Sequence, residues 1–97
     1  MEMEIDQRFE TRLDEAFEGN GGTRRVVARQ ARDLADSGQF ETDMDRELTA
    51  AVVVENLRDA PEDLVLPEKW NWWMGALELA YGGYDRFRVL RWAGQSG

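Results

Sequence analysis

The sequence contains no cysteine and no histidine among its 97 residues. The absence of cysteine excludes disulfide bonds and thiol chemistry. Together the two absences remove the side chains that zinc prefers as ligands and the one that most often carries general acid–base catalysis. The sequence therefore predicts a protein that is not an enzyme and that holds no metal and no cofactor.

Positive charge is scarce, and lysine is almost absent. Asp and Glu number 20 against 12 for Lys and Arg, which gives a net charge of −8 at pH 7, and Lys69 is the only lysine. This charge opposes attraction to nucleic acids and anionic membranes, and it destabilises a compact chain at low ionic strength by self-repulsion. In about 1 M salt the Debye length falls to about 3 Å and screens the repulsion. The bias is typical of adaptation to molar salt, although codon preference in a high-GC genome would also favour Arg over Lys.

Long apolar runs are missing as well. No window approaches 18 uninterrupted apolar residues, so the sequence predicts no transmembrane helix. The acidic start, residues 1–4, lacks the basic and apolar regions of a secretory signal, which favours a soluble, cytoplasmic protein. The length is that of one domain. We therefore expect residues 1–97 to form a single helical domain in which residues 94–97 are frayed.

Apolar residues recur at intervals of three and four, which predicts a mainly α fold. A first helix is expected over residues 5–17, ending at the glycine-rich segment 19–22. A second helix, capped by Thr23, would run to Ser37 and Gly38. A third, capped by Thr42, would continue through the apolar run Ala50 to Val54.

Two prolines precede the last predicted helix. Pro61 and Pro67 bracket a linker, and Pro67 suits the first position of a helix that continues to Tyr81 and stops at Gly82-Gly83. The alternation over residues 86–89 is typical of a strand, which allows a short C-terminal β pair with residues 64–66. The expected architecture is a bundle of about four helices, with or without that β pair.

The last predicted helix is apolar on two faces. One face, expected to be core, combines Trp70, Trp73, Met74, Leu77, Ala80 and Tyr81. The opposite face carries Trp72, Ala76 and Leu79. A surface helix needs only one apolar face, so the second is covered either by the chain's own tail or by another protein. The predicted partner interface is Trp72, Ala76, Leu79 and Trp92, and a homodimer is the expected assembly, with another protein as the other partner.

Four arginines gather on the second predicted helix. Arg25, Arg29 and Arg32 project within about 60° of one another, with Arg24 further round. Such a stripe can contact phosphate groups or pair with the acidic face of the first helix. The negative net charge favours the pairing. Nucleic-acid binding through Arg24, Arg25, Arg29 and Arg32 is therefore the alternative function.

A catalytic site would have to use carboxylates or tyrosines. Glu55 is the carboxylate of interest because it projects on the same face as Leu48 and Val52. A buried Glu55 in a pocket beside Tyr81 or Tyr84 would favour a carboxylate-based enzyme. An exposed Glu55 at the edge of the apolar stripe would not.

The acid–arginine composition, with the segment Lys69–Gly75 and the segment Phe87–Trp92, resembles that of a known group. The chain is similar to the small, acidic, uncharacterised proteins of halophilic archaea, a group that includes a protein of Halobacterium. The resemblance extends over most of the chain and implies a cytoplasm rich in potassium chloride, but it implies no activity and no site residues. The predicted function is a non-catalytic, salt-adapted interaction protein that self-associates through its Trp-rich last helix.

Overall fold

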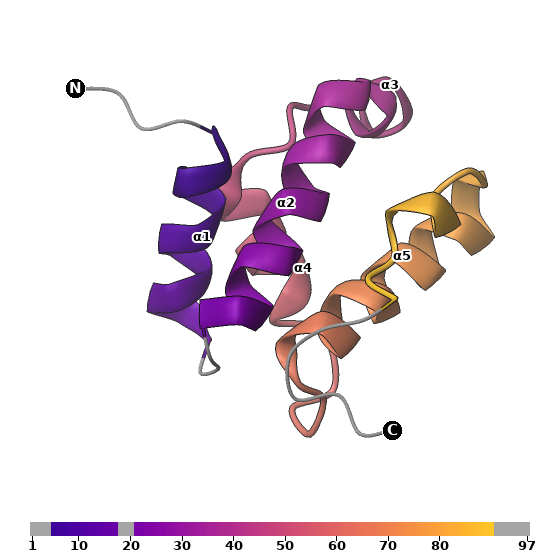
Figure 1. The fold of residues 1–97 in the computed structure, drawn as a ribbon. Helices are drawn as coiled ribbons and strands as arrows, with labels where there is room; N and C mark the ends of the chain where they lie inside the picture. The colour runs from indigo at the N-terminus through magenta and orange to yellow at the C-terminus, as the bar shows by residue number, and fades with distance from the viewer. Residues whose placement is uncertain (1–4, 18–20, 91–97) are drawn as a thin grey trace.

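The computed structural model describes residues 5–17 and 21–90 (Figure 1). Within these ranges the chain is helical and contains no β-strand. The elements in chain order are α1 (Ile5–Ala16), α2 (Gly21–Ser37), α3 (Gln39–Met44), α4 (Ala50–Leu57), α5 (Leu66–Tyr81) and the 3₁₀ helix η1 (Asp85–Phe87). The prediction of a mainly α fold is confirmed.

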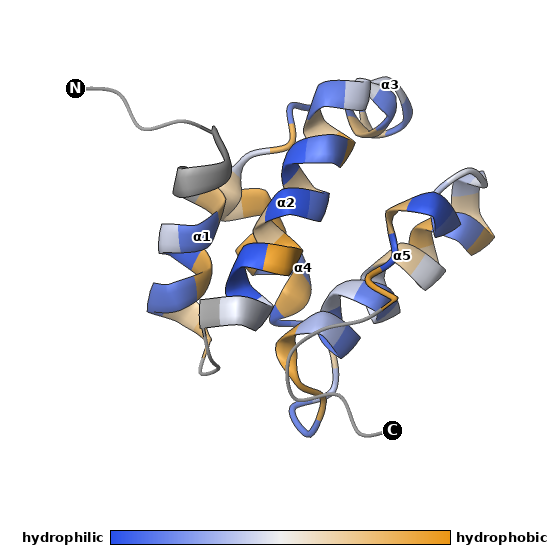
Figure 2. Cartoon of the chain, in the orientation of Figure 1, coloured by the Kyte–Doolittle hydropathy of each residue, from blue (hydrophilic) through white to orange (hydrophobic). Residues whose placement is uncertain are grey.

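Helix α2 is the centre of the arrangement. It packs against α1, α3, α5 and η1, while α4 contacts both α1 and α5. The apolar faces of the helices turn toward one another and the polar faces turn outward (Figure 2), as expected for amphipathic helices. The core is continuous across these elements, and its largest fully buried side chains are Trp70, Tyr84, Phe9 and Phe40.

The first two helices follow the apolar periodicity, but the predicted cap of the second is wrong. Phe9 and Leu13 of α1 are buried, as are Val27 and Ala31 of α2. Helix α2 begins at Gly21, so Thr23 lies inside its first turn and is itself buried. An N-cap residue must precede the helix and keep non-helical torsion angles, and Thr23 therefore cannot act as one.

The predicted third helix is divided into two. Gly38 (φ 72°) separates α2 from α3, and Asp45 (φ 55°) ends α3 after six residues. Thr42 is not a cap, because its hydroxyl donates to the carbonyl of Gly38 within the helix at 3.0 Å. The cap of α4 is Thr49, whose Oγ1 accepts a hydrogen bond from the backbone N–H of Val52 at 3.2 Å.

A packing contact accounts for the short helix α3. Phe40 is fully buried and meets the ring of Trp73 edge-on, with a centroid distance of 5.8 Å. Helix α4 contacts both α1 and α5. It is separated from α3 by the break at Asp45, whose φ is 55°.

The last helix is α5, as predicted, with Pro67 in its first turn and Gly82 at its end. The side chain of Glu68 also accepts a hydrogen bond from the backbone N–H of Val65 at 3.1 Å, which satisfies a group that the helix start leaves unpaired. Of the face expected to be core, Trp70, Trp73, Met74 and Leu77 are buried, whereas Ala80 and Tyr81 are exposed. Both exposed residues lie in the last turn of α5, beyond the rest of the core face.

The allowed β pair does not form. Residues 85–87 make η1, and residues 88–90 and 64–65 are not strands. Residues 82–90, which we call the strap, turn back at the end of α5 and run along that helix (Figure 1). Side chains of α5 satisfy the backbone of the strap, which therefore does not need a neighbouring strand.

Candidate interaction surface

The four side chains of residues 70–73 in α5 differ in their burial and in their contacts. The indole of Trp70 is fully buried, and its Nε1–H donates to the backbone carbonyl of Phe87 in the strap at 2.8 Å. Its ring also meets that of Trp73 edge-on, at a centroid distance of 5.5 Å and an interplanar angle of 86°. Trp70 therefore joins the core to the strap, and Trp73 belongs to the core.

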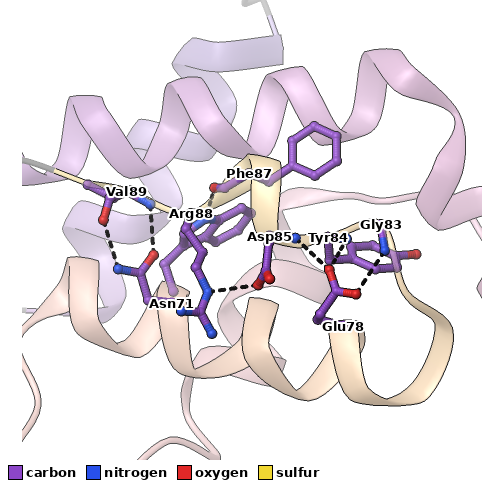
Figure 3. A network of polar contacts seen from close by, with 9 residues as sticks. Asn71, Glu78, Gly83, Tyr84, Asp85, Phe87, Arg88 and Val89 are labelled. Carbon is purple, nitrogen blue, oxygen red and sulfur yellow. Dashed lines mark hydrogen bonds and ion pairs between the residues drawn. The ribbon is translucent and has the colours of Figure 1, made fainter.

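Asn71 holds the end of the strap (Figure 3). Its Nδ2 donates to the carbonyl of Val89 at 2.8 Å, and its Oδ1 accepts from the N–H of the same residue at 2.7 Å. The side-chain amide thus replaces the backbone partner that a neighbouring strand would supply. Because both polar groups of Val89 are satisfied, its side chain can be buried without leaving an unpaired backbone group.

Glu78 holds the start of the strap. Its carboxylate accepts hydrogen bonds from three successive backbone N–H groups: those of Gly83 at 3.1 Å, Tyr84 at 2.9 Å and Asp85 at 2.9 Å (Figure 3). These hydrogen bonds lower the pKa of Glu78 below its ordinary value, and the bond from Asp85 has the largest effect. Desolvation of the carboxylate acts in the opposite direction. The sequence carried a signal for this role, since Glu78 is the only charged residue between Trp70 and Tyr84.

Between these two anchors the strap passes over Gly75. A Cβ atom at Gly75 would lie 2.9 Å from Nη2 of Arg88, so the absence of a side chain lets the arginine rest against the helix. Arg88 also pairs with Asp85 of the strap, with 3.1 Å between Nε and Oδ1. The line Asn71, Gly75 and Glu78 is therefore the edge of α5 that the strap covers.

The strap also forms hydrogen bonds with residues of α3. The phenol of Tyr84 is buried and donates to Oδ2 of Asp43 at 2.7 Å. Burial first, and then this hydrogen bond, raises the pKa of Tyr84 above its ordinary value. Gln39 donates to the carbonyl of Gly83 at 2.9 Å. Sequence reasoning missed these contacts because about forty residues separate the partners.

The outward face of α5 is only partly covered by the described part of the chain. Trp72 is 41% exposed and Leu79 is 92% exposed, with exposed Ala76 between them. Val65, 52% exposed, continues the same line before the helix. At 100° per residue the helical positions Trp72, Ala76 and Leu79 fall within about 60° of one another, and Val65 precedes them as the N-cap of α5. We call Val65, Trp72, Ala76 and Leu79 the outer stripe.

The structure thus brings together three of the four residues of the predicted partner interface. The fourth, Trp92, lies outside the described residues, as does the segment 94–97 expected to be frayed. Asn71 and Glu78, which hold the strap, project about 100° and 120° away from Trp72 on α5. The strap as described therefore flanks the outer stripe without covering it.

A family model described as the WNWW domain matches residues 2–78. The chain belongs to the WNWW domain family. Searches among curated proteins and among solved structures gave no match. Residues 70–73 spell the four letters of the family description. In this WNWW motif, the first, second and fourth residues bind the strap or fill the core, and the third, Trp72, does neither.

The arginines lie on a different part of the WNWW domain. Arg24 pairs with Asp14 of α1, with 3.3 Å between Nε and Oδ1. Arg32 pairs with Asp36 of its own helix, with 3.9 Å between Nε and Oδ2. Arg25 and Arg29 are exposed and, together with Arg32 and Glu10, border an open groove of about 590 Å³. The pairing of Arg24 with α1 agrees with the structural interpretation of these residues.

The three residues considered for a catalytic site, Glu55, Tyr81 and Tyr84, differ in burial. Glu55 is exposed on α4, Tyr84 is buried against Asp43, and Tyr81 is 50% exposed. The carboxylate pocket that would have favoured an enzyme does not form around Glu55. In residues 5–17 and 21–90, no three acidic side chains lie close enough together to hold a metal ion. No helix there has the length and apolarity needed to cross a bilayer.

Proposed function

We propose that this chain is a non-catalytic interaction protein that self-associates, in the molar salt of a cytoplasm, through the outer stripe of α5. The observation that supports it is the exposure of Trp72 between the buried residues Trp70 and Trp73. Tryptophan is costly to leave in water, and it is enriched at the centres of interfaces. A stripe of exposed apolar side chains along one helix is the kind of surface that a partner covers.

The charge distribution supports a second copy as that partner. Two chains that each carry a net charge of −8 repel one another at most points of their surfaces. The stretch Trp70 to Tyr84 has a single charge, Glu78, and its carboxylate is already bonded by three backbone N–H groups. Between Trp72 and Leu79 the outer stripe is therefore a surface where two copies can meet without bringing unpaired carboxylates together, and Glu68, which lies before Trp72, accepts the hydrogen bond from the backbone N–H of Val65.

The setting follows from the same charges. Molar salt reduces the Debye length to about 3 Å and screens the repulsion between copies. Salts that are excluded from apolar surface also strengthen its burial. The acid excess and the preference for Arg over Lys support such a salt-adapted cytoplasm. Self-association should accordingly strengthen as potassium chloride is raised.

The test is the solution mass, measured by size-exclusion chromatography with light scattering in molar potassium chloride. We expect a mass twice the 11.2 kDa of the chain. Trp72→Ala should weaken association by about 2 kcal/mol, or about 30-fold in Kd, because it removes the largest apolar group of the stripe.

The matched control is Met44→Ala, which removes an exposed apolar side chain from α3, away from the stripe. This variant should associate as the wild type does. A wild-type protein that stays monomeric at every concentration and salt level would contradict the proposal. So would a dimer that the Trp72 and Met44 variants weaken equally.

A further inference from the structure

We infer that two copies pair α5 against α5 in antiparallel orientation, about a two-fold axis that passes close to Ala76. This inference rests on the self-association proposed above and specifies its geometry. Three features of the described residues lead to it: the order of side-chain sizes along the outer stripe, the charges on the strap beside it, and the small side chain of Ala76.

The part of the outer stripe from Trp72 to Leu79 is nearly symmetric in size about Ala76. Trp72 lies four residues before Ala76 and Leu79 lies three residues after it, so a small side chain stands between two large ones. In an antiparallel pair centred on Ala76, Trp72 of one copy comes opposite the Leu79 region of the other. Trp72 of each copy then packs beside Leu79 of the second copy. The same patch on both copies is thereby self-complementary, as a two-fold interface requires.

The small side chain of Ala76 allows the two helices to approach closely. Ala76 is exposed, whereas the open side of Gly75 is occupied by Arg88 of the strap. Packed helices are separated by about 8–10 Å, and the smallest separations need small side chains at the crossing point. A crossing at Ala76 therefore lets Trp72 and Leu79 reach across to the second copy on both sides of the axis.

The charges of the strap distinguish antiparallel from parallel pairing. Arg88 lies beside Gly75, and Asp85 donates its N–H to Glu78, so the two residues lie near the level of Ala76 along the helix. Their side chains are 43% and 64% exposed. A two-fold rotation about an axis perpendicular to the helices places the strap edges of the two copies on the same side of the interface. The two strap edges then run in opposite directions. Arg88 of one copy then faces Asp85 of the other, twice in the dimer.

A parallel pair lacks this charge complementarity. It would place the strap edge of one copy against the opposite edge of the other, which carries Ala80 beside the stripe. The exposed Arg88 and Asp85 would then have no opposite charge across the interface at their level. Interfacial charge pairs contribute to orientation more than to affinity, so they decide here which way the two helices run.

The experiment introduces single cysteine residues, because the chain has no native cysteine that could form a competing disulfide. Ala76→Cys places the thiol at the proposed axis, where facing Cα atoms of helices about 8–10 Å apart lie about 4–5 Å from one another, within disulfide reach. Val65→Cys is the matched control on the same exposed stripe. It lies eleven residues away, so antiparallel pairing separates the two copies by about 33 Å at that position. Parallel pairing would bring them as close as at Ala76.

We expect mild oxidation in molar potassium chloride to convert the Ala76→Cys variant into a covalent dimer and to leave the Val65→Cys variant uncrosslinked. Crosslinking of both variants, or of Val65→Cys alone, would overturn the antiparallel pairing. Failure of both variants to crosslink while light scattering still shows a Trp72-dependent dimer would overturn this geometry and leave the proposed self-association intact. Failure of both together with a monomeric mass would overturn both proposals.

Discussion

The side-chain amide of Asn71 forms hydrogen bonds with both backbone polar groups of Val89, at 2.8 and 2.7 Å. Val89 is buried, so water cannot replace these bonds without opening the strap. The side chain of Asn71 therefore supplies the hydrogen-bond partners that a neighbouring strand would supply in a sheet. This contact, and the others along α5, lead to four predictions about stability. All are best measured at protein concentrations low enough that self-association does not contribute.

Asn71→Ala should lower the free energy of unfolding by about 2 kcal/mol, because two hydrogen bonds are lost and both polar groups of Val89 are left unpaired. Denaturant unfolding in molar potassium chloride, followed by circular dichroism, measures the change. Asn56→Ala is the control, since Asn56 bonds only within α4, to the carbonyl of Val52. It should change stability by less than about 0.5 kcal/mol. Equal effects of the two substitutions would contradict the role given to Asn71.

Trp70→Phe should destabilise the fold by about 2–4 kcal/mol. The substitution removes the donor to the carbonyl of Phe87 and leaves a cavity in the core. Trp72→Phe, two residues away, should stay within about 0.5 kcal/mol because Trp72 is 41% exposed and is not one of the core residues. Thermal unfolding of the two variants side by side provides the comparison, and a larger loss for Trp72 would show that its ring is covered within one chain.

Glu78 should make the stability depend on pH in the acid range. Its pKa is lower in the native state than the ordinary 4.5, so the unfolded chain takes up the proton more readily. The stabilisation is therefore present above about pH 4.5 and is lost as the pH falls through the native pKa. Glu78→Gln should flatten the stability profile in this range.

The control for this profile is Glu55→Gln, which removes an exposed carboxylate from α4. Unfolding free energies of the wild type and both variants, measured from neutral pH down to about pH 3, isolate the contribution of Glu78. An acid profile of Glu78→Gln that matches that of Glu55→Gln would contradict the assignment.

Tyr84 should make the stability depend on pH in the alkaline range. Burial and the hydrogen bond to Asp43 raise its native pKa above the ordinary 10.0, so the unfolded chain loses the proton first. Stability should thus hold below about pH 10 and fall as the pH rises above it. Tyr84→Phe should flatten this fall and lower stability at neutral pH by about 1 kcal/mol, because Asp43 loses its donor. Tyr81→Phe is the control, because it removes an exposed phenol hydroxyl and keeps the hydrogen bond from Tyr84 to Asp43, and unfolding measured from pH 7 to about pH 11 should still show the alkaline fall in this variant.

Much of the helical structure followed from neighbours in the sequence. The spacing of Phe9 and Leu13 and of Val27 and Ala31 predicted which faces of α1 and α2 are buried. The start of α5 at Leu66-Pro67 and its end at Gly82 agree with the punctuation of the chain. Such features depend on torsion angles and side chains within one or two turns, which a sequence displays directly.

The helix boundaries between residues 38 and 50 did not follow in the same way. Thr42 precedes Asp43 and Thr49 precedes Ala50, and both threonines are suited to cap a helix. The choice of Thr49 depends on Phe40 reaching Trp73 and on Asp45 adopting φ 55°. These are properties of the packed chain, so local preference could not distinguish the two caps.

By itself, the sequence determined the mainly helical class, the acidic and arginine-rich surface, and the presence of more tryptophan on the last helix than one face can bury. Periodicity also placed Trp72 on the face opposite Trp70 and Trp73, and only the tertiary structure decided that residues 82–90 leave Trp72 partly exposed. Trp70 and Asn71 are fixed by contacts with Phe87 and Val89, seventeen and eighteen residues further along the chain. Periodicity places side chains on a helix, but it carries no information about where a distant segment returns. Trp72 is exposed because the strap follows the edge of α5 that carries Asn71 and Glu78.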